Sequence, residues 1–237
     1  MKIITLFDKA TKNKKLHTGW GVSFLVDNKI LFDTGENGEW LIENMKILKV
    51  DIDKIQAVVI SHDHWDHQGG LWSLLQKRKG LTVYVCLNFS REFKDKVKKL
   101  KGKLIENEKI TEISKNIFVT GGIASEYKGK YTPEQALVIK TDKGVSVITG
   151  CAHPGIVKML EEVKSNFPNC PIYSVLGGFH LKDKDTQVIK LTADKFKKMA
   201  IEKVGPTHCS GGVAEEIFKK RYEANFIQVE TGEILNV

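Results

Sequence analysis

Four segments of this chain place histidines beside glycines where a predicted strand gives way to a loop or helix. The apolar run AVVI leads into SHDHWDHQGG, and the other three segments are TGCAHPG, LGGFHL and PTHCSGG. Six of the seven histidines fall in these four segments. Glycine there lets the backbone and a ligand approach closely. The fold must therefore present polar side chains at several strand ends.

The segment Ser61–Gly70 has the spacing of a metal-binding loop, with five titratable groups within six residues. Neutral imidazole suits zinc and other first-row metals, and carboxylate suits harder ions. His62 and His64 can point to the same side of an extended turn and chelate one ion. Asp66 and His67 are then placed for a second ion. One loop cannot complete both coordination shells, so further ligands must come from elsewhere in the chain. The candidates are His153, His180 and His208.

Short β-like runs alternate with helical stretches, which predicts an α/β fold. Strands are expected at Lys2–Phe7, Val22–Val26, Lys29–Asp33, Ala57–Ile60, Thr82–Cys86, Ile117–Thr120, Ala136–Thr141, Val145–Thr149, Ile172–Leu176, Phe226–Val229 and Glu233–Leu235. Helices are expected at Trp40–Leu48, from Leu71, after a Ser90 cap, and at Ile156–Phe167, Asp185–Glu202 and Ala214–Arg221. No low-complexity linker interrupts the chain, so residues 1–237 are interpreted as one domain of two similar halves, each a sheet covered by helices.

The longest loop-like stretch is Gly121–Pro133, which carries glycines, tyrosines and lysines. Long loops in compact domains are often lids or binding loops. Lys128 and Lys130 are candidates for contact with an anionic substrate. His17 lies in a separate lysine-rich segment and is expected to be a surface residue.

The chain has 37 Lys and Arg against 29 Asp and Glu, a formal net charge of +8, but only three arginines. Lysines dispersed along a chain are typical of a solvated surface, and no clustered basic stripe indicates a nucleic-acid partner. The apolar stretches are too short to span a bilayer, and the first residues do not resemble a secretory signal. We therefore expect a cytoplasmic protein whose four cysteines are free thiols. The sequence predicts no oligomeric state.

These segments resemble the metallo-β-lactamase fold superfamily along nearly the whole chain. The resemblance rests on LFDTG at 31–35, SHDHWDH at 61–67, TGCAHPG at 149–155 and PTHCSGG at 206–212. More narrowly, TGCAHPGI, GGFHL and HCSGG are similar to the branch that contains the archaeal methanopterin-pathway synthase, which joins a dihydropterin pyrophosphate to a ribofuranosyl-aminobenzene phosphate. The superfamily implies a four-layer αββα sandwich with one or two divalent metal ions on one edge, zinc first, with iron or manganese as alternatives.

Carried over by motif, the resemblance implies two sets of ligands and one residue that orients the metal loop by hydrogen bonding, Asp33. The implied ligands are His62, His64 and His153 for one ion, and Asp66, His67 and His208 for the other. Most binuclear members have an aspartate after the fourth motif's strand that bridges the metals. This chain has Gly177–His180 there, without a carboxylate. His180 is therefore expected either to ligate metal or to contact substrate, and metal number stays open.

The leading hypothesis is a metal-dependent hydrolase that uses a metal-activated water on a small, anionic or phosphorylated substrate. Asp66 would also orient that water, and His180 would stabilise a developing oxyanion or protonate the leaving group. The alternatives are the transferase reaction of the synthase branch, a nuclease or RNA-binding protein, and a metal-binding protein without catalysis.

Overall fold

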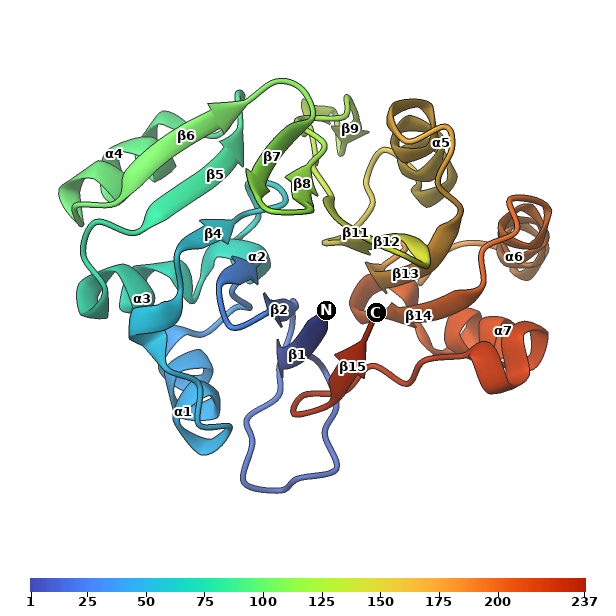
Figure 1. Cartoon of the computed structure of the whole chain (residues 1–237), viewed down its shortest axis with the longest axis horizontal. Helices are drawn as coiled ribbons and strands as arrows, with labels where there is room; N and C mark the ends of the chain where they lie inside the picture. Colours follow the sequence, from blue (N-terminus) through green and yellow to red (C-terminus); the bar gives the residue numbers. More distant parts are fainter. The chain divides into compact units, whose positions relative to one another are not determined.

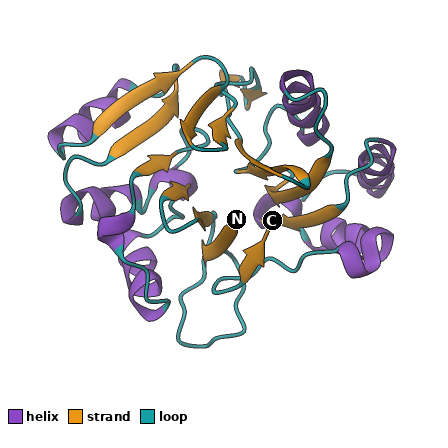
Figure 2. Ribbon diagram, in the orientation of Figure 1, coloured by secondary structure: helices purple, strands orange, loops and turns teal.

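The computed structural model describes residues 1–237, which divide into two units. The first unit comprises Met1–Glu108 and Glu230–Asn236, and the second comprises Lys109–Val229 and Val237. Each unit has a mixed β-sheet with helices packed on it (Figure 2), which confirms the predicted α/β class. The prediction that residues 1–237 form a single domain remains a prediction.

The first unit is built on a seven-stranded sheet of order β15-β1-β2-β3-β4-β5-β6. Its strands are β1 (Lys2–Phe7), β2 (Ser23–Val26), β3 (Ile30–Phe32), β4 (Ala57–Val59), β5 (Thr82–Cys86), β6 (Lys103–Asn107) and β15 (Ile234–Asn236). The strands from β3 to β6 run parallel to their neighbours, and the others are antiparallel. The parallel part therefore brings the carboxyl ends of β3 and β4 side by side, with Phe32 opposite Val59.

Helices cover one face of this sheet (Figure 1). They are α1 (Gly38–Ile47), α3 (Leu71–Lys77) and α4 (Arg91–Lys99), with the short α2 (Trp65–Gln68) and the 3-10 turn η1 (Ile52–Lys54) in the connections. Apolar residues of the three helices, such as Leu41, Leu74 and Phe93, form one buried cluster with Leu31 and Val58 of the strands. Ser90 caps α4 by accepting a hydrogen bond from the backbone N–H of Phe93, which confirms the predicted cap.

The second unit has a six-stranded sheet of order β14-β13-β12-β11-β8-β7 and a separate two-stranded hairpin. The sheet strands are β7 (Thr111–Ser114), β8 (Ile117–Val119), β11 (Leu137–Thr141), β12 (Gly144–Thr149), β13 (Ile172–Gly178) and β14 (Lys203–Thr207). The hairpin strands are β9 (Glu126–Tyr127) and β10 (Lys130–Tyr131). β12, β13 and β14 are parallel neighbours, so the segments after them emerge at one edge of the sheet. Ligand sites of α/β sheets lie at such carboxyl ends.

Three helices pack on this second sheet (Figure 1). They are α5 (Ile156–Asn166), α6 (Thr186–Lys198) and α7 (Gly212–Tyr222), and the 3-10 turns are η2 (His208–Ser210) and η3 (Glu223–Asn225). Phe179, Phe196 and Phe218 are fully buried between these elements, with ring centroids 5.2–5.5 Å apart. Tilted and edge-to-face contacts of this kind add to the apolar burial that fixes the helices on the sheet. The longest helix has 13 residues, and no helix has the length and apolarity of a membrane span.

Two expectations about local structure are wrong. Phe226–Val229 forms no strand and makes only an isolated bridge from Phe226 to Val204. The segment Gly121–Pro133 is not all loop, because it contains the β9–β10 hairpin. The strands β6 and β7 escaped prediction because they are short, mostly polar and only partly buried, and so lack the apolar alternation that marks a strand.

The buried hydroxyl of Tyr222 supplies a test of the second unit's core. Tyr222 is 3% exposed, and its hydroxyl has no hydrogen-bond partner. Burial raises the pKa of Tyr222 to about 12. A folded pKa above the unfolded value of about 10 means that stability present below about pH 10 is lost as the pH rises through about 12.

Tyr222→Phe should therefore raise the free energy of unfolding by about 1 kcal/mol at neutral pH, because an unsatisfied buried hydroxyl is removed. Its advantage over the wild type should widen near pH 11, since the variant has no phenol to ionise. Urea denaturation at both pH values measures this, with the exposed Tyr131→Phe as the control. An advantage that is equal at both pH values would contradict the assignment.

Candidate functional site

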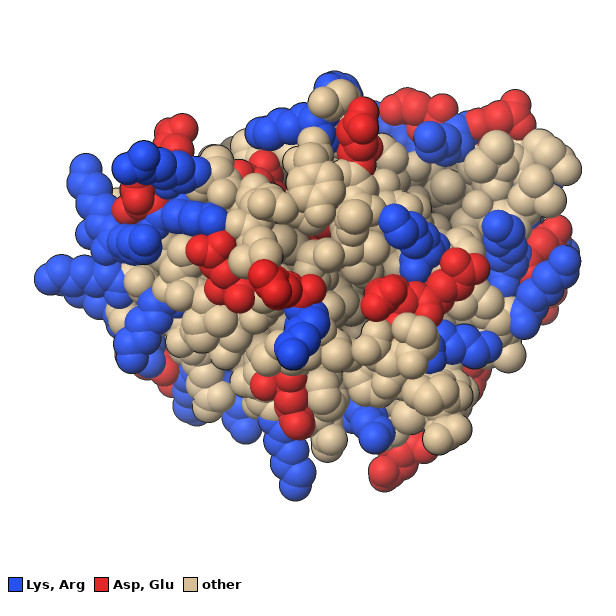
Figure 3. Space-filling model, turned by 90° about the horizontal axis from the view of Figure 1, so that it is seen from above, with Lys and Arg blue, Asp and Glu red and all other residues tan.

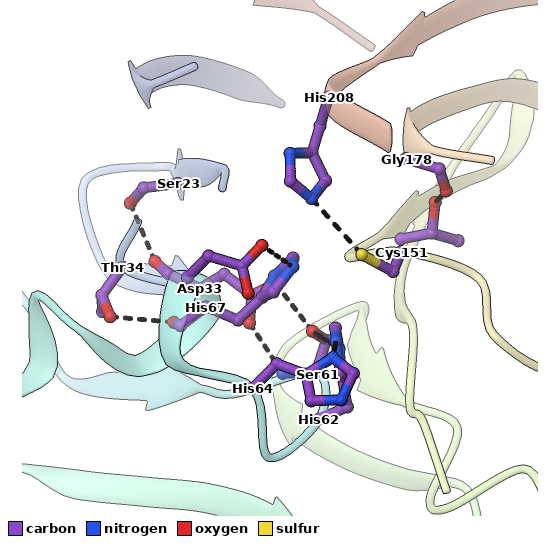
Figure 4. A network of polar contacts seen from close by, with 12 residues as sticks. Ser23, Asp33, Thr34, Ser61, His62, His64, His67, Cys151, Gly178 and His208 are labelled. Atoms are coloured by element: carbon purple, nitrogen blue, oxygen red, sulfur yellow. Dashed lines mark hydrogen bonds and ion pairs between the residues drawn. The ribbon is translucent and has the colours of Figure 1, made fainter. Parts of the chain in front are cut away.

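In the first unit, the buried carboxylate of Asp33 holds the loop of residues 61–67, the candidate metal-binding loop (Figure 4). Asp33 follows β3, and Ser61 follows the neighbouring strand β4. Asp33 Oδ1 accepts a hydrogen bond from the backbone N–H of Ser61, and Oδ2 accepts one from the Ser61 hydroxyl, both at 2.7 Å. His67 Nδ1 lies 2.6 Å from Asp33 Oδ2. A single carboxylate therefore holds both ends of the loop.

The surroundings of His67 are negative, because two carboxylates flank its buried ring. Burial alone would lower the pKa of His67, but the carboxylates of Asp33 and Asp66 outweigh it and raise that pKa well above the ordinary value. Because Nδ1 faces Asp33, Nε2 is directed towards Asp66, whose Oδ2 lies at 3.4 Å. An imidazole and a carboxylate facing one another in this way form a donor pair that fits a divalent cation.

His62 and His64 present ring nitrogens to each other. His62 Nε2 and His64 Nδ1 are 2.9 Å apart, and Ser61 Oγ lies 2.9 Å from His62 Nδ1. Two imidazole ligands of one tetrahedral zinc ion would have their nitrogens about 3.3 Å apart, given zinc–nitrogen bonds of about 2.0–2.1 Å. The pair therefore fits a single metal ion with only a small outward movement of the rings.

The loop backbone is fixed from two sides. Both the backbone N–H and the hydroxyl of Thr34 donate to the carbonyl of His67 at 2.9 Å. At Gly21 the backbone φ is +95°, and a Cβ there would lie 1.9 Å from the Asp66 carbonyl oxygen. A side chain at position 21 would displace the loop, so glycine is required.

In the second unit, His153, His180 and Tyr127 form a cluster of rings. The ring centroids of His153 and His180 are 4.6 Å apart, and Tyr127 lies 4.5 Å from the first and 5.5 Å from the second. The ligand atoms of Cys151, His153 and His180 all lie within 4.8 Å of one another. Tyr127 reaches the histidines because the β9–β10 hairpin carries it there.

A second buried carboxylate, Glu134, holds the turn that bears His153. Its Oε1 accepts hydrogen bonds from the backbone N–H groups of Cys151 and Ala152, and its Oε2 accepts one from that of His153, all at 2.8 Å. The side chain is fully buried. Three charge-assisted hydrogen bonds to one turn fix the direction in which that turn presents its side chains.

His208 begins the turn after β14 and is also buried. Its Nε2 lies 3.3 Å from the Cys151 sulfur (Figure 4). Four residues of the two histidine-bearing regions have left-handed backbones, with φ between 51° and 64°: Asp33, Ala152, His180 and His208. Such conformations cost of order 1–3 kcal/mol each and are retained where the surrounding structure holds them.

The structure gathers the predicted residues within each unit. The first unit brings together Asp33, His62, His64, Asp66 and His67. The second unit brings together His153, His180 and His208 around Cys151. Sequence reasoning missed Tyr127, Glu134 and Cys151 as parts of this arrangement. Glu134 had no signal, since it acts on backbone groups 17 to 19 residues further along the chain.

The candidate lysines and His17 lie in different surroundings. Lys128 Nζ lies 5.2 Å from the ring centroid of Tyr127, and Lys130 is exposed on β10. His17 stacks on the Trp40 ring, and its Nε2 lies against the Glu43 carboxylate. His17 is thus a partly exposed residue engaged elsewhere in the first unit.

Glu134→Gln tests the carboxylate that holds the His153 turn. The amide would keep the shape but direct an N–H towards a backbone N–H, so at least one buried donor would lose its acceptor. We expect the free energy of unfolding to fall by about 2–3 kcal/mol in urea denaturation. The exposed Glu161→Gln on α5 is the matched control and should change stability by less than about 0.5 kcal/mol. Equal stability of the two variants would show that the three hydrogen bonds are not needed.

The model of the metallo-beta-lactamase superfamily matches residues 21–214. The 7,8-dihydropterin-6-methyl-4-(beta-D-ribofuranosyl)-aminobenzene-5'-phosphate synthase of Methanocaldococcus jannaschii is 29% identical over 283 residues, covering 99% of this chain and 96% of the synthase.

Among solved structures, that of Tm1679, a metal-dependent hydrolase of the beta-lactamase superfamily, is 31% identical with a TM-score of 0.85, covering 100% of this chain and 99% of that one. Human tRNase Z, short form, is 17% identical with a TM-score of 0.64, covering 100% and 99%, and shares the fold. The family match spans most of the chain and includes the histidine-bearing segments. This chain belongs to the metallo-β-lactamase superfamily.

Proposed function

We propose that this protein is a metal-dependent hydrolase that acts on a small anionic substrate such as a phosphate ester. The observation that carries the proposal is the convergence of His62 Nε2 and His64 Nδ1 at 2.9 Å. The neighbouring His67 ring is held at its Nδ1 by the Asp33 carboxylate. A surface turn would not bury His62, His67 and the Asp33 carboxylate completely, as they are here. Buried imidazoles that face each other are typical of a metal site.

The proposed ligands are those that the resemblance to the superfamily implies. In the first unit they are His62, His64, Asp66 and His67, and in the second unit His153 and His208. The ions would be one or two divalent metals, zinc first. When bound, such a metal supplies a Lewis acid that polarises the substrate and lowers the pKa of water. Asp33 would orient His67 and the loop, and Asp66 would also position the attacking water.

His180 is the proposed proton donor to the leaving group. Hydrogen bonding with Cys209 raises the pKa of His180 above its ordinary value, against an opposing effect of burial. The charge of Glu134 acts in the same direction, and that of Lys184 acts against it. A half-buried imidazole whose pKa is raised is suited to general acid catalysis.

The support for an anionic substrate is a pocket of about 290 Å³ beside His153 and His180 in the second unit. Lys158 and Lys184 line it, together with the first residues of α5. The N-terminus of α5 has Gly155 as its cap residue and no side-chain cap, so its positive end is presented to this pocket. Lysine side chains and a helix N-terminus together favour phosphate or carboxylate. Lys128 and Lys130 are proposed as further contacts from the hairpin.

A nucleic-acid substrate is not proposed. On the face drawn in Figure 3, basic side chains are interspersed with acidic ones and separated by large areas without charge. A nucleic-acid surface would instead show a continuous basic stripe. A salt titration with single-stranded RNA checks this, because a binder weakens steeply with salt.

The transferase reaction of the synthase branch is the second candidate. It is favoured by the full-length similarity to the methanopterin-pathway synthase, and by Trp65, which is 61% exposed next to His64. An exposed indole offers a planar face on which a pterin ring could stack. Metal-loaded protein should be incubated with a dihydropterin pyrophosphate and the ribofuranosyl-aminobenzene phosphate, and in parallel with phosphomonoester, phosphodiester, thioester and lactone substrates. A condensed product supports the transferase, and hydrolysis in the panel alone supports the hydrolase.

The double variant His62→Ala/His64→Ala tests the metal assignment. It removes both converging nitrogens, so its zinc content after reconstitution and dialysis should fall by at least one equivalent relative to the wild type. Elemental analysis measures the loss, and hydrolysis of the panel substrate should fall at least about 100-fold. His17→Ala, in the same unit, is the control and should leave both unchanged. Full metal occupancy in the double variant would refute the assignment.

A further inference from the structure

We propose that the thiolate of Cys151 is a metal ligand that shares one ion with His208. This inference rests on the proposed metal-dependent function and adds a sulfur ligand to it. Binding would release the thiol proton to solvent, because only the thiolate ligates.

The distance between the two donor atoms supports a shared ion. Cys151 Sγ lies 3.3 Å from His208 Nε2. A tetrahedral zinc ion with bonds of about 2.3 Å to sulfur and about 2.0–2.1 Å to nitrogen separates the two ligand atoms by about 3.6 Å. The observed spacing is within a few tenths of an ångström of this value, and Figure 4 shows the sulfur directed at the ring nitrogen.

The sulfur is held in place by the surrounding backbone. Cys151 is 5% exposed, and Glu134 accepts a hydrogen bond from its backbone N–H. Its carbonyl accepts a hydrogen bond from Cys209 Sγ at 3.4 Å. The next residue, Ala152, has a left-handed backbone with φ 64°. Such fixation is the preorganisation that a metal ligand needs.

The same sulfur also faces the other histidines of the second unit. Its distance to the ligand atoms of His153 and of His180 is no more than 4.8 Å. The Cys151 sulfur thus lies close to all three histidines of the second unit. A thiolate there would supply an anionic ligand in a region where the strand end at Gly177–His180 carries no carboxylate.

The backbone prevents a carboxylate from taking that place. A Cβ on Gly178 would lie 2.3 Å from the Gly150 carbonyl oxygen and 2.7 Å from Cys209 Sγ. A Cβ on Gly177 would lie 2.1 Å from the Thr149 carbonyl oxygen. Neither glycine can be replaced by an aspartate without moving the sheet, so these two positions cannot supply an anionic ligand.

Cys209 is the other thiol of this region, and its geometry is different. Its sulfur donates to the carbonyl oxygen of Cys151 and is buried beside the place of a Gly178 side chain. It also hydrogen-bonds with the side chains of Cys151 and His180, whereas the Cys151 sulfur lies 3.3 Å from His208 Nε2. Cys209→Ser is the matched control for Cys151→Ser, since the two sulfurs are buried in the same unit.

A sulfur ligand has a consequence for metal choice. Thiolate is a soft ligand that favours zinc and disfavours magnesium and manganese. We expect Cys151→Ser to bind zinc at least about tenfold more weakly than the wild type, and to discriminate less between zinc and manganese.

Cobalt(II) spectroscopy of the metal-depleted full chain tests the ligand directly. The wild type and Cys209→Ser should show the near-ultraviolet thiolate-to-cobalt charge-transfer band, and Cys151→Ser should lack it while still binding cobalt. Circular dichroism before loading establishes that each variant is folded. X-ray absorption of the zinc-loaded wild type needs no variant and should show one sulfur at about 2.3 Å.

The outcomes separate the two proposals. A band lost in Cys209→Ser and kept in Cys151→Ser would overturn the assignment in favour of the other thiol. Cobalt bound to the wild type without a band, together with no sulfur at the zinc ion, would overturn the inference and leave the metal-dependent function intact. A wild-type protein that binds neither zinc nor cobalt would refute the proposed function itself.

Discussion

The hydrogen bonds of one buried carboxylate, Asp33, hold the histidine-bearing loop of the first unit in place. Without it, the backbone N–H of Ser61 and the ring of His67 would be buried without their acceptor, and each such group costs about 1–3 kcal/mol. Glu134 has the same role in the second unit, where its carboxylate accepts hydrogen bonds from three consecutive backbone N–H groups. In both units a turn that bears histidines follows a strand and is held by a carboxylate from a different segment. The cost of burying each carboxylate is offset by the hydrogen bonds it accepts.

The topology explains why these turns lie where they do. Parallel neighbours expose their carboxyl ends at the same sheet edge, as β3 and β4 do in the first unit and β12, β13 and β14 do in the second. Asp33, His180 and His208 leave these strand ends with left-handed backbones that direct their side chains. The aromatic core of Phe179, Phe196 and Phe218 stabilises the second sheet against that local strain.

The sequence allowed much of this to be predicted, and the omissions have physical reasons. The spacing of the histidines and Asp66 within one loop indicated a metal site, and the alternation of apolar runs with helical stretches predicted the α/β class. Tyr127 and Glu134 could not be found, because their contacts join residues far apart in the chain through packing. Strands β6 and β7 were missed because an exposed edge strand need not be apolar. Cys151 was visible beside His153, but only the fold places its sulfur against His208.

The tight packing around Gly177 and Gly178 also limits how the sequence can change at the end of β13. A side chain at either glycine would collide with the backbone of the neighbouring strand end, at the Thr149 or the Gly150 carbonyl oxygen. A larger residue at these positions would therefore need coordinated changes in the turn after β12. A chain that evolves by single substitutions, each of which must still fold, keeps both glycines for as long as those two carbonyl groups keep their place.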